Sequence, residues 1–187
     1  MGLFSLFQRN QHEAPARALY EALVAQARQP AFYSTLGVPD TPDGRYDLIA
    51  LHAFLVMRRL KAENADPEDQ KLSQTVFDIM FVDVDRNLRE MGVSDIAIGG
   101  RVKSVAKGFF GRVAAYDGGL AAADDKVLMD SLRRNVYRKT EPDNDQVAVL
   151  AAYVRQQAFH LEQQSMGDLR RGEITFAGLP DVIEVRE

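Results

Sequence analysis

The sequence predicts an all-α fold, a bundle of about six helices around a central apolar helix, followed by a short non-helical C-terminal tail. Apolar residues recur every three to four positions in several long stretches, which is the period of an α-helix. One stretch, residues 48–57, is apolar at every position except His52. Short segments rich in Pro, Gly and Asp separate these stretches, as expected of loops between helices.

The central helix is predicted to run from Asp43 to Leu60. A helix that is apolar on nearly every face must be surrounded by protein or by lipid. Because its apolar run is shorter than the roughly 20 residues that span a bilayer, we expect other helices to surround it. Asp43 follows Pro42 and is the predicted N-cap, and Arg58 and Arg59 lie at the C-terminal end, where the helix dipole favours positive charge.

The other helices follow from the same periodicity. Gly108 and Gly111 lie inside one of them and each weakens it by roughly 1 kcal/mol relative to Ala, so we expect close packing or a bend there. We expect residues 93–100 to form a linker, and Asp117 with the two glycines after it to end this helix. The predicted ranges are Ala14 to Arg28, Pro67 to Met91, Gly100 to Tyr116, Leu120 to Arg138 and Val147 to Leu161.

The chain is expected to form one helical domain, residues 13–166. A flexible N-terminal segment, residues 1–12, precedes it, and a C-terminal tail, residues 167–187, packs on the domain or trails from it. The 23 basic and 27 acidic residues give a net charge of −4, which does not favour a DNA-binding protein. The absence of Cys excludes disulfides and thiolate metal sites. Because no nucleotide-binding, hydrolase or zinc-protease motif is present, we expect no cofactor and no enzyme.

The densest group of charged residues lies in the predicted helix that ends at Met91. Its aspartates could be metal ligands or acid–base groups, or they could form an ion-paired face turned to solvent or to the arginines of the central helix. The second interpretation is favoured, because no matching His or Glu accompanies them. If Asp78 is buried, it needs a donor such as His52 or an arginine of the central helix. The group comprises Asp78, Asp83, Asp85, Arg86, Arg89 and Glu90.

His52 is the only polar residue in the apolar part of the central helix. It is either a core histidine hydrogen-bonded to a neighbour or a ligand of haem or of a metal ion. We favour the core histidine. The alternative function is therefore a helical ligand-binding protein, in which haem or a quinone lies against His52 and aromatic side chains. These aromatic residues are Tyr46, Phe54, Phe77 and Phe81.

Two basic stretches could contact phosphate on RNA or on lipid headgroups. The first contains Arg101, Lys103, Lys107 and Arg112, with no acidic residue between Ile96 and Tyr116. The second lies at residues 133–139 and also suits a helix C-terminus. Basic helix faces are usually only solvated, and we favour that interpretation for both.

Two stretches together resemble the ubiquinol–cytochrome c chaperone family. The first is DGRYDLIALHAFLVMRRL, residues 43–60, and the second is FDIMFVDVDRNLREMGVSDIAIGGRVK, residues 77–103. The resemblance covers roughly residues 32–112, and the helical regions after it are compatible with the family. It implies a non-enzymatic assembly chaperone for the respiratory ubiquinol–cytochrome c reductase that binds newly made cytochrome b.

The resemblance also implies the ribosomal exit region and a second assembly factor as partners. The N-terminus lacks an Arg-rich, acid-poor presequence, which favours a bacterial relative in the cytoplasm, with peripheral contact at the inner membrane. We expect the partner-binding residues to come from three of the predicted helices. They are Tyr46, His52, Phe54, Arg58, Arg59, Asp78, Asp83, Asp85, Arg86, Arg89, Arg101, Lys103 and Lys107.

Overall fold

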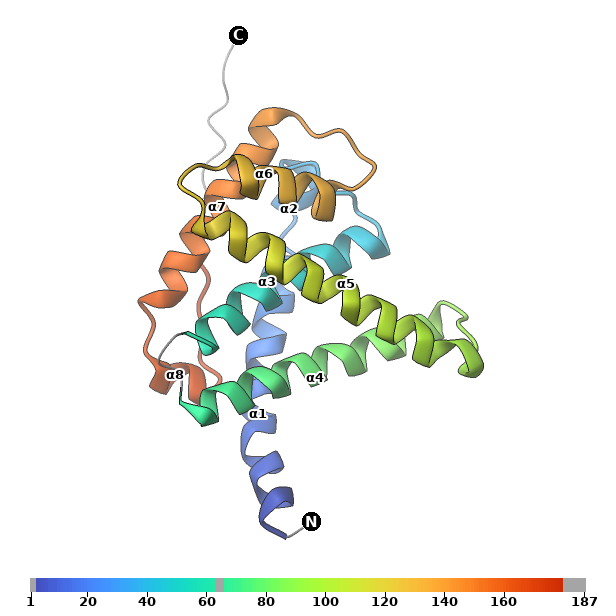
Figure 1. The fold of residues 1–187 in the computed structure, drawn as a ribbon, viewed down its shortest axis with the longest axis vertical. Helices are drawn as coiled ribbons and strands as arrows, with labels where there is room; N and C mark the ends of the chain where they lie inside the picture. Colours follow the sequence, from blue (N-terminus) through green and yellow to red (C-terminus); the bar gives the residue numbers. More distant parts are fainter. Residues whose placement is uncertain (1–2, 63–65, 180–187) are drawn as a thin grey trace.

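The computed structural model describes residues 3–62 and 66–179, which form helices and connecting segments without a β-strand (Figure 1). This confirms the predicted all-α class. The long helices are α1 (Leu3–Ala27), α3 (Pro42–Leu60), α4 (Pro67–Glu90), α5 (Asp95–Ala121) and α7 (Asn144–Glu162). Shorter elements are α2 (Ala31–Ser34), α6 (Lys126–Leu132), the π-helical turn η1 (Arg133–Tyr137) and α8 (Met166–Arg170).

Helix α3 is the centre of the bundle, as its apolar sequence predicts. It contacts α1, α4, α5, α7 and η1, and its residues from Leu48 to Met57 are buried, apart from the partly buried Ile49. The N-cap is Thr41 rather than the predicted Asp43, because the Thr41 hydroxyl accepts a hydrogen bond from the Gly44 amide at 3.1 Å. Pro42 then occupies the first helical position, where its missing N–H costs nothing.

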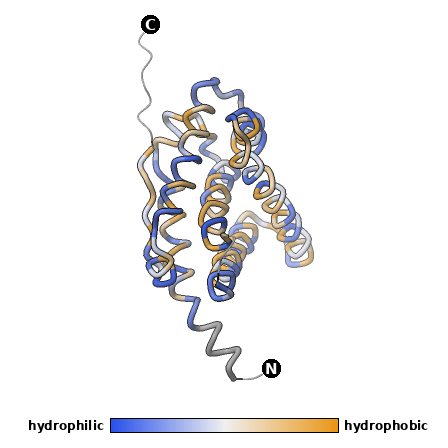
Figure 2. Tube along the Cα trace, turned by 60° about the vertical axis from the view of Figure 1, so that its left-hand side comes forward, coloured by the Kyte–Doolittle hydropathy of each residue, from blue (hydrophilic) through white to orange (hydrophobic). Residues whose placement is uncertain are grey.

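The hydrophobic core has two parts, one on each side of α3. One part packs α3 against α2, α6, η1 and α7, and the other packs it against α1, α4 and Phe109 of α5. Hydrophobic and hydrophilic residues alternate around the outer helices in Figure 2, as expected of helices that bury one face. Burial of this apolar surface is the main stabilising contribution to the bundle.

Helix α5 is longer than predicted at both ends. Residues 95–100, expected in a linker, form its first turns, and the two glycines expected to end it lie inside it. Gly119 accounts for the C-terminal difference, because a Cβ atom there would lie 2.8 Å from Leu128 Cα on α6. The glycine therefore permits close contact of two helices. Close packing or a bend was expected at Gly108 and Gly111. Close packing is not found, because a Cβ atom at Gly108 would meet only the Arg112 side chain within 4 Å, and one at Gly111 would meet nothing.

Three other boundaries differ from prediction. Helix α1 begins at Leu3 rather than Ala14 and continues through Pro15, whose ring removes one backbone hydrogen bond without ending the helix. The predicted helix from Leu120 to Arg138 is divided, because α5 extends to Ala121 and α6 begins at Lys126. The tail is helical at its start, because the Ser165 hydroxyl caps α8 by accepting from the Gly167 amide at 3.1 Å.

Residues 173–179 of the predicted tail are extended and pack on the domain. Two glutamines of α7 and the turn after it hold this segment through paired hydrogen bonds to its backbone. The Gln157 amide group accepts from the Ala177 N–H at 3.0 Å and donates to the Ala177 carbonyl at 2.8 Å. Gln164 pairs with the Thr175 backbone in the same way, at 2.9 and 2.8 Å. The last part of the predicted tail, residues 180–187, lies outside the described residues.

Candidate partner-binding groove

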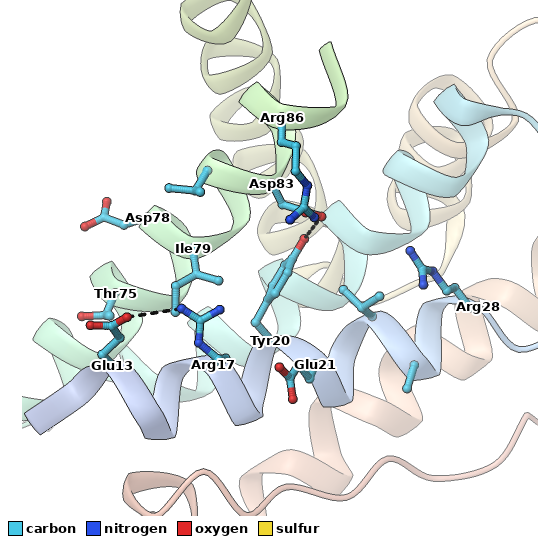
Figure 3. Close-up of a pocket in the computed structure, with 13 residues that line it drawn as sticks. Glu13, Arg17, Tyr20, Glu21, Arg28, Thr75, Asp78, Ile79, Asp83 and Arg86 are labelled. Carbon is cyan, nitrogen blue, oxygen red and sulfur yellow. Dashed lines mark hydrogen bonds and ion pairs between the residues drawn. The ribbon is translucent and has the colours of Figure 1, made fainter. Parts of the chain in front are cut away.

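A groove of about 1040 Å³ lies between α1 and α4 (Figure 3). Its apolar lining includes Val24, Ile79 and Val82, and the Val82 side chain is 70% exposed. Helices α1 and α4 pack against each other through other residues, including Leu19 and Val76, which are fully buried. The two helices therefore leave an open apolar strip beside their contact. The complete lining is Glu13, Arg17, Tyr20, Glu21, Val24, Ala25, Arg28, Thr75, Asp78, Ile79, Val82, Asp83 and Arg86.

Charged groups of both signs border this groove. The Tyr20 hydroxyl donates a hydrogen bond to Asp83 at 2.9 Å, and Asp83 also pairs with Arg86 (Figure 3). Burial and the Asp83 carboxylate raise the pKa of Tyr20, so its hydroxyl keeps its proton at neutral pH. Arg17 pairs with Glu13 at 3.2 Å across one turn of α1. Tyr20 thus joins α1 to the charged face of α4 within the groove.

The charged residues of α4 form the ion-paired, solvent-facing surface that we favoured. Arg89 pairs with Asp85 at 2.7 Å and also with Asp95 at the start of α5. Asp78 is exposed and accepts a hydrogen bond from Gln74 at 2.8 Å. Its carboxylate therefore does not need a donor from the central helix. In the ranges 3–62 and 66–179, no group of three or more Asp, Glu or His residues is arranged to hold a metal ion. Asp78, Asp83 and Arg86 contribute to the groove, whereas Asp85 and Arg89 do not line it.

His52 is a core residue, as we favoured over a haem or metal ligand. It is fully buried, its Nδ1 lies 2.8 Å from the Leu48 carbonyl oxygen, and its Nε2 lies 2.7 Å from the Tyr153 hydroxyl. Tyr153 also accepts a hydrogen bond from Gln26 at 3.0 Å, and Phe176 contacts the His52 ring edge-on. Both ring nitrogens are therefore engaged by the protein. Burial lowers the pKa of His52 to about 4, which keeps the ring neutral.

The other candidates on α3 stabilise the bundle. Phe54 is buried against Tyr116, and the Arg112 guanidinium lies 5.9 Å from the centre of the Tyr46 ring. Arg58 pairs with Glu162 of α7 at 2.8 Å and with Asp117 of α5 at 3.2 Å. Arg59 donates to the carbonyl oxygens of Leu161 and Gln164, both at 2.8 Å, and so caps the C-terminal end of α7.

Asp47 is a central charged group that was not among the expected site residues. Its carboxylate is fully buried and accepts from Arg112 at 2.8 Å and from Arg138 at 2.7 Å. Burial raises the pKa of Asp47, while the two guanidinium groups oppose that shift. An acidic residue in the first turns of an otherwise apolar helix was the available signal. One arginine of each region that we considered for phosphate binding, Arg112 and Arg138, thus pairs with this buried carboxylate.

Arg101, Lys103 and Lys107 of α5 are exposed and pair with no carboxylate of the described part of the chain. They lie on the half of α5 that extends toward the α4–α5 loop, at the right-hand edge of Figure 1. The other charged candidates on α3 and α4, except Asp78 and the capping Arg59, form ion pairs. The structure therefore separates a paired charged surface on α4 from an unpaired basic surface on α5. No described helix is both long and apolar enough to cross a membrane.

Comparison with known proteins identifies similar chains. A family model described as ubiquinol-cytochrome C chaperone matches residues 34–176. A solved structure, the crystal structure of the Cbp3 homolog from Brucella abortus, is 38% identical, with a TM-score of 0.82. The match covers 95% of this chain and 98% of that one.

Curated relatives carry the name ubiquinol-cytochrome c reductase complex assembly factor 1. The chain is 25% identical over 165 residues to the Xenopus laevis protein, which covers 88% of this chain and 81% of that protein. It is 27% identical over 147 residues to the Drosophila melanogaster protein, covering 77% of this chain and 56% of the relative. The match to the Mus musculus protein covers 51% of that relative. The chain therefore spans about half the length of the fly and mouse proteins.

Proposed function

Because this chain belongs to the ubiquinol–cytochrome c chaperone family, we propose that it is an assembly chaperone for the ubiquinol–cytochrome c reductase and holds newly made cytochrome b. The α1–α4 groove is the observation that supports a site for such a client. The relatives are named assembly factors, and the proposed activity requires binding without a chemical step. The family resemblance also supports the ribosomal exit region and a second assembly factor as partners, in the bacterial cytoplasm beside the inner membrane.

The groove suits an apolar helical segment with polar ends. A membrane-protein segment outside the bilayer must cover its apolar surface to avoid aggregation. Val24, Ile79 and Val82 offer apolar contact along the groove, and an amphipathic helix binds such a surface through side chains spaced three and four residues apart. Arg17, Arg28 and the acidic groups opposite them can pair with charges that flank the segment. Binding here leaves the two core clusters intact, so release of the client does not require unfolding.

Site-specific photocrosslinking tests this proposal. A photoreactive amino acid at Val82, which is 70% exposed in the groove, should crosslink cytochrome b in cells that are synthesising the reductase. The matched control places it at Phe159 of α7, which is 65% exposed and does not line the groove. Adducts at Val82 and none at Phe159 are expected. Equal yields at both positions, or no cytochrome b at Val82 while other proteins are captured, would contradict the proposed site.

A further inference from the structure

The outward face of α5 combines apolar and basic side chains. Its positions follow one another at intervals of four, three, four, three and four residues, so they form a single stripe along the helix. The buried positions of the same helix, including Ile98, Phe109 and Tyr116, lie on the opposite side. We call the stripe the α5 outer face. It consists of Ile96, Gly100, Lys103, Lys107, Phe110 and Ala114.

Large apolar groups stand near both ends of this face. The Ile96 side chain is 99% exposed and Phe110 is 53% exposed, although one side of its ring stacks on Phe77 of α4. Fourteen residues at about 1.5 Å each place them about 21 Å apart along the axis. Met91, in the adjacent loop, is also 59% exposed. Single exposed apolar residues are common, but an almost fully exposed isoleucine on the same helix face as an exposed phenylalanine indicates a contact surface.

Unpaired positive charge lies between these apolar ends. Lys103 and Lys107 flank a shallow depression of about 650 Å³ that includes Gly100 and Phe110. Neither lysine has a carboxylate partner among residues 3–62 and 66–179, and Asp95 at the start of α5 pairs with Arg89. The chain has a net charge of −4, so this face is a local exception to its overall acidity. A basic face of this kind complements a surface of negative charge.

We propose that the α5 outer face docks on the surface of an anionic lipid bilayer. Anionic headgroups would attract Lys103 and Lys107, whose ammonium groups can remain at headgroup level while Ile96 and Phe110 enter the boundary with the acyl chains. RNA would supply the same phosphate charge, but it offers no apolar layer that removes the fully exposed Ile96 from water. The apolar ends of the face therefore favour lipid over RNA.

This surface is separate from the proposed client groove. The groove is lined by α1 and α4, and none of its lining residues belongs to α5. A bilayer contact through α5 would leave the groove open to a client at the membrane. Failure of lipid binding and failure of cytochrome b crosslinking would therefore be distinguished by different measurements on different residues.

Vesicle flotation of the purified full chain tests the proposal. The probes are vesicles of phosphatidylcholine alone and vesicles of equal parts phosphatidylcholine and phosphatidylglycerol, at low and at physiological salt. The double variant Lys103→Glu/Lys107→Glu should lower the affinity for the anionic vesicles by about tenfold or more, since each lysine near such a surface contributes several-fold. The matched control, Lys126→Glu/Lys139→Glu, makes the same charge change at exposed positions outside this face.

We expect the wild type to bind only the anionic vesicles. The first double variant should lose this binding, and the control variant should retain it. The single variant Ile96→Ser should bind anionic vesicles more weakly than the wild type at physiological salt. The substitution removes an apolar contact and leaves both lysines in place. Absence of wild-type binding, or equal loss in the two double variants, would overturn the proposal. Loss of binding to purified ribosomal RNA in the first variant with unchanged vesicle binding would assign the face to RNA instead. Circular dichroism checks that each variant keeps its helical content.

Discussion

Lowering the pH from about 7 to about 5 should destabilise this fold through His52. The ring is fully buried, and burial lowers its pKa from 6.5 to about 4 despite the opposing hydrogen bond with the Leu48 carbonyl. The unfolded chain takes up a proton near the ordinary pKa, whereas the folded ring stays neutral until the pH approaches the lower value. Between these two values the unfolded state binds more protons, so stability falls as the pH falls.

The two pKa values determine the size of this effect. The contribution of neutral His52 is fully present above its unfolded pKa of 6.5 and is lost progressively as the pH decreases toward about 4. At about pH 5, the difference in proton binding lowers the free energy of unfolding by about 2 kcal/mol relative to neutral pH. This is a substantial part of the roughly 5–15 kcal/mol that stabilises a typical domain. No carboxylate contacts the ring among the described residues, because its polar neighbours are the Leu48 carbonyl and the Tyr153 hydroxyl.

Urea unfolding of the wild type and of His52→Gln at both pH values measures this contribution. Glutamine does not titrate, so the variant should lose about 2 kcal/mol less than the wild type between the two pH values, whatever its stability at neutral pH. If His52→Gln loses as much stability as the wild type on acidification, burial of His52 is not the source of the acid sensitivity and the reasoning is refuted.

Two further substitutions test packing and buried charge by the same urea assay at neutral pH. Gly119→Ala should destabilise the domain by about 1–3 kcal/mol, because the new Cβ would meet Leu128 Cα at 2.8 Å. Asp47→Asn should cost about 2–4 kcal/mol, because it leaves its two arginine partners, which are only partly exposed, without their buried counter-charge.

Each of these substitutions has a neighbouring control. Gly118→Ala has open space around the new Cβ and should be neutral or stabilising by up to about 1 kcal/mol, through helix propensity. Asp43→Asn removes an exposed partner of Arg138 and should cost less than about 1 kcal/mol. Equal effects of the two glycine substitutions would show that α5 and α6 do not approach closely at Gly119. A loss for Asp47→Asn no larger than that for Asp43→Asn would show that the buried carboxylate is not stabilising.

Helix α5 illustrates where local sequence signals failed. Glycines at residues 99, 100, 118 and 119 are unfavourable in a helix, so they predicted a linker and a stop. The helix forms through them because tertiary contacts outweigh propensity, most clearly where Gly119 lies against α6. By contrast, α4 ends at Glu90, one residue before the predicted end at Met91, and Gly92 follows with a positive φ of 88°, a conformation that favours glycine.

The candidate site was predictable only in part. Spacing within one helix is sufficient to explain the pair of Arg89 and Asp85 in the predicted ion-paired face, since residues four apart face each other. The same spacing carries no information about Tyr20, which reaches Asp83 from a different helix. The groove exists because α1 lies beside α4, and no pattern within either helix specifies that neighbour.

By itself, the sequence determined the all-α class, the central position of α3, the ion-paired face of α4 and the resemblance to a chaperone family. These properties depend on periodicity, helix-end residues and contacts across one helical turn. Only the tertiary structure decided which residues pair with Asp47 and His52, which charges remain unpaired on α5, and where a groove opens. Those properties depend on contacts between residues far apart in the chain, which many different packings of the same amphipathic helices could satisfy.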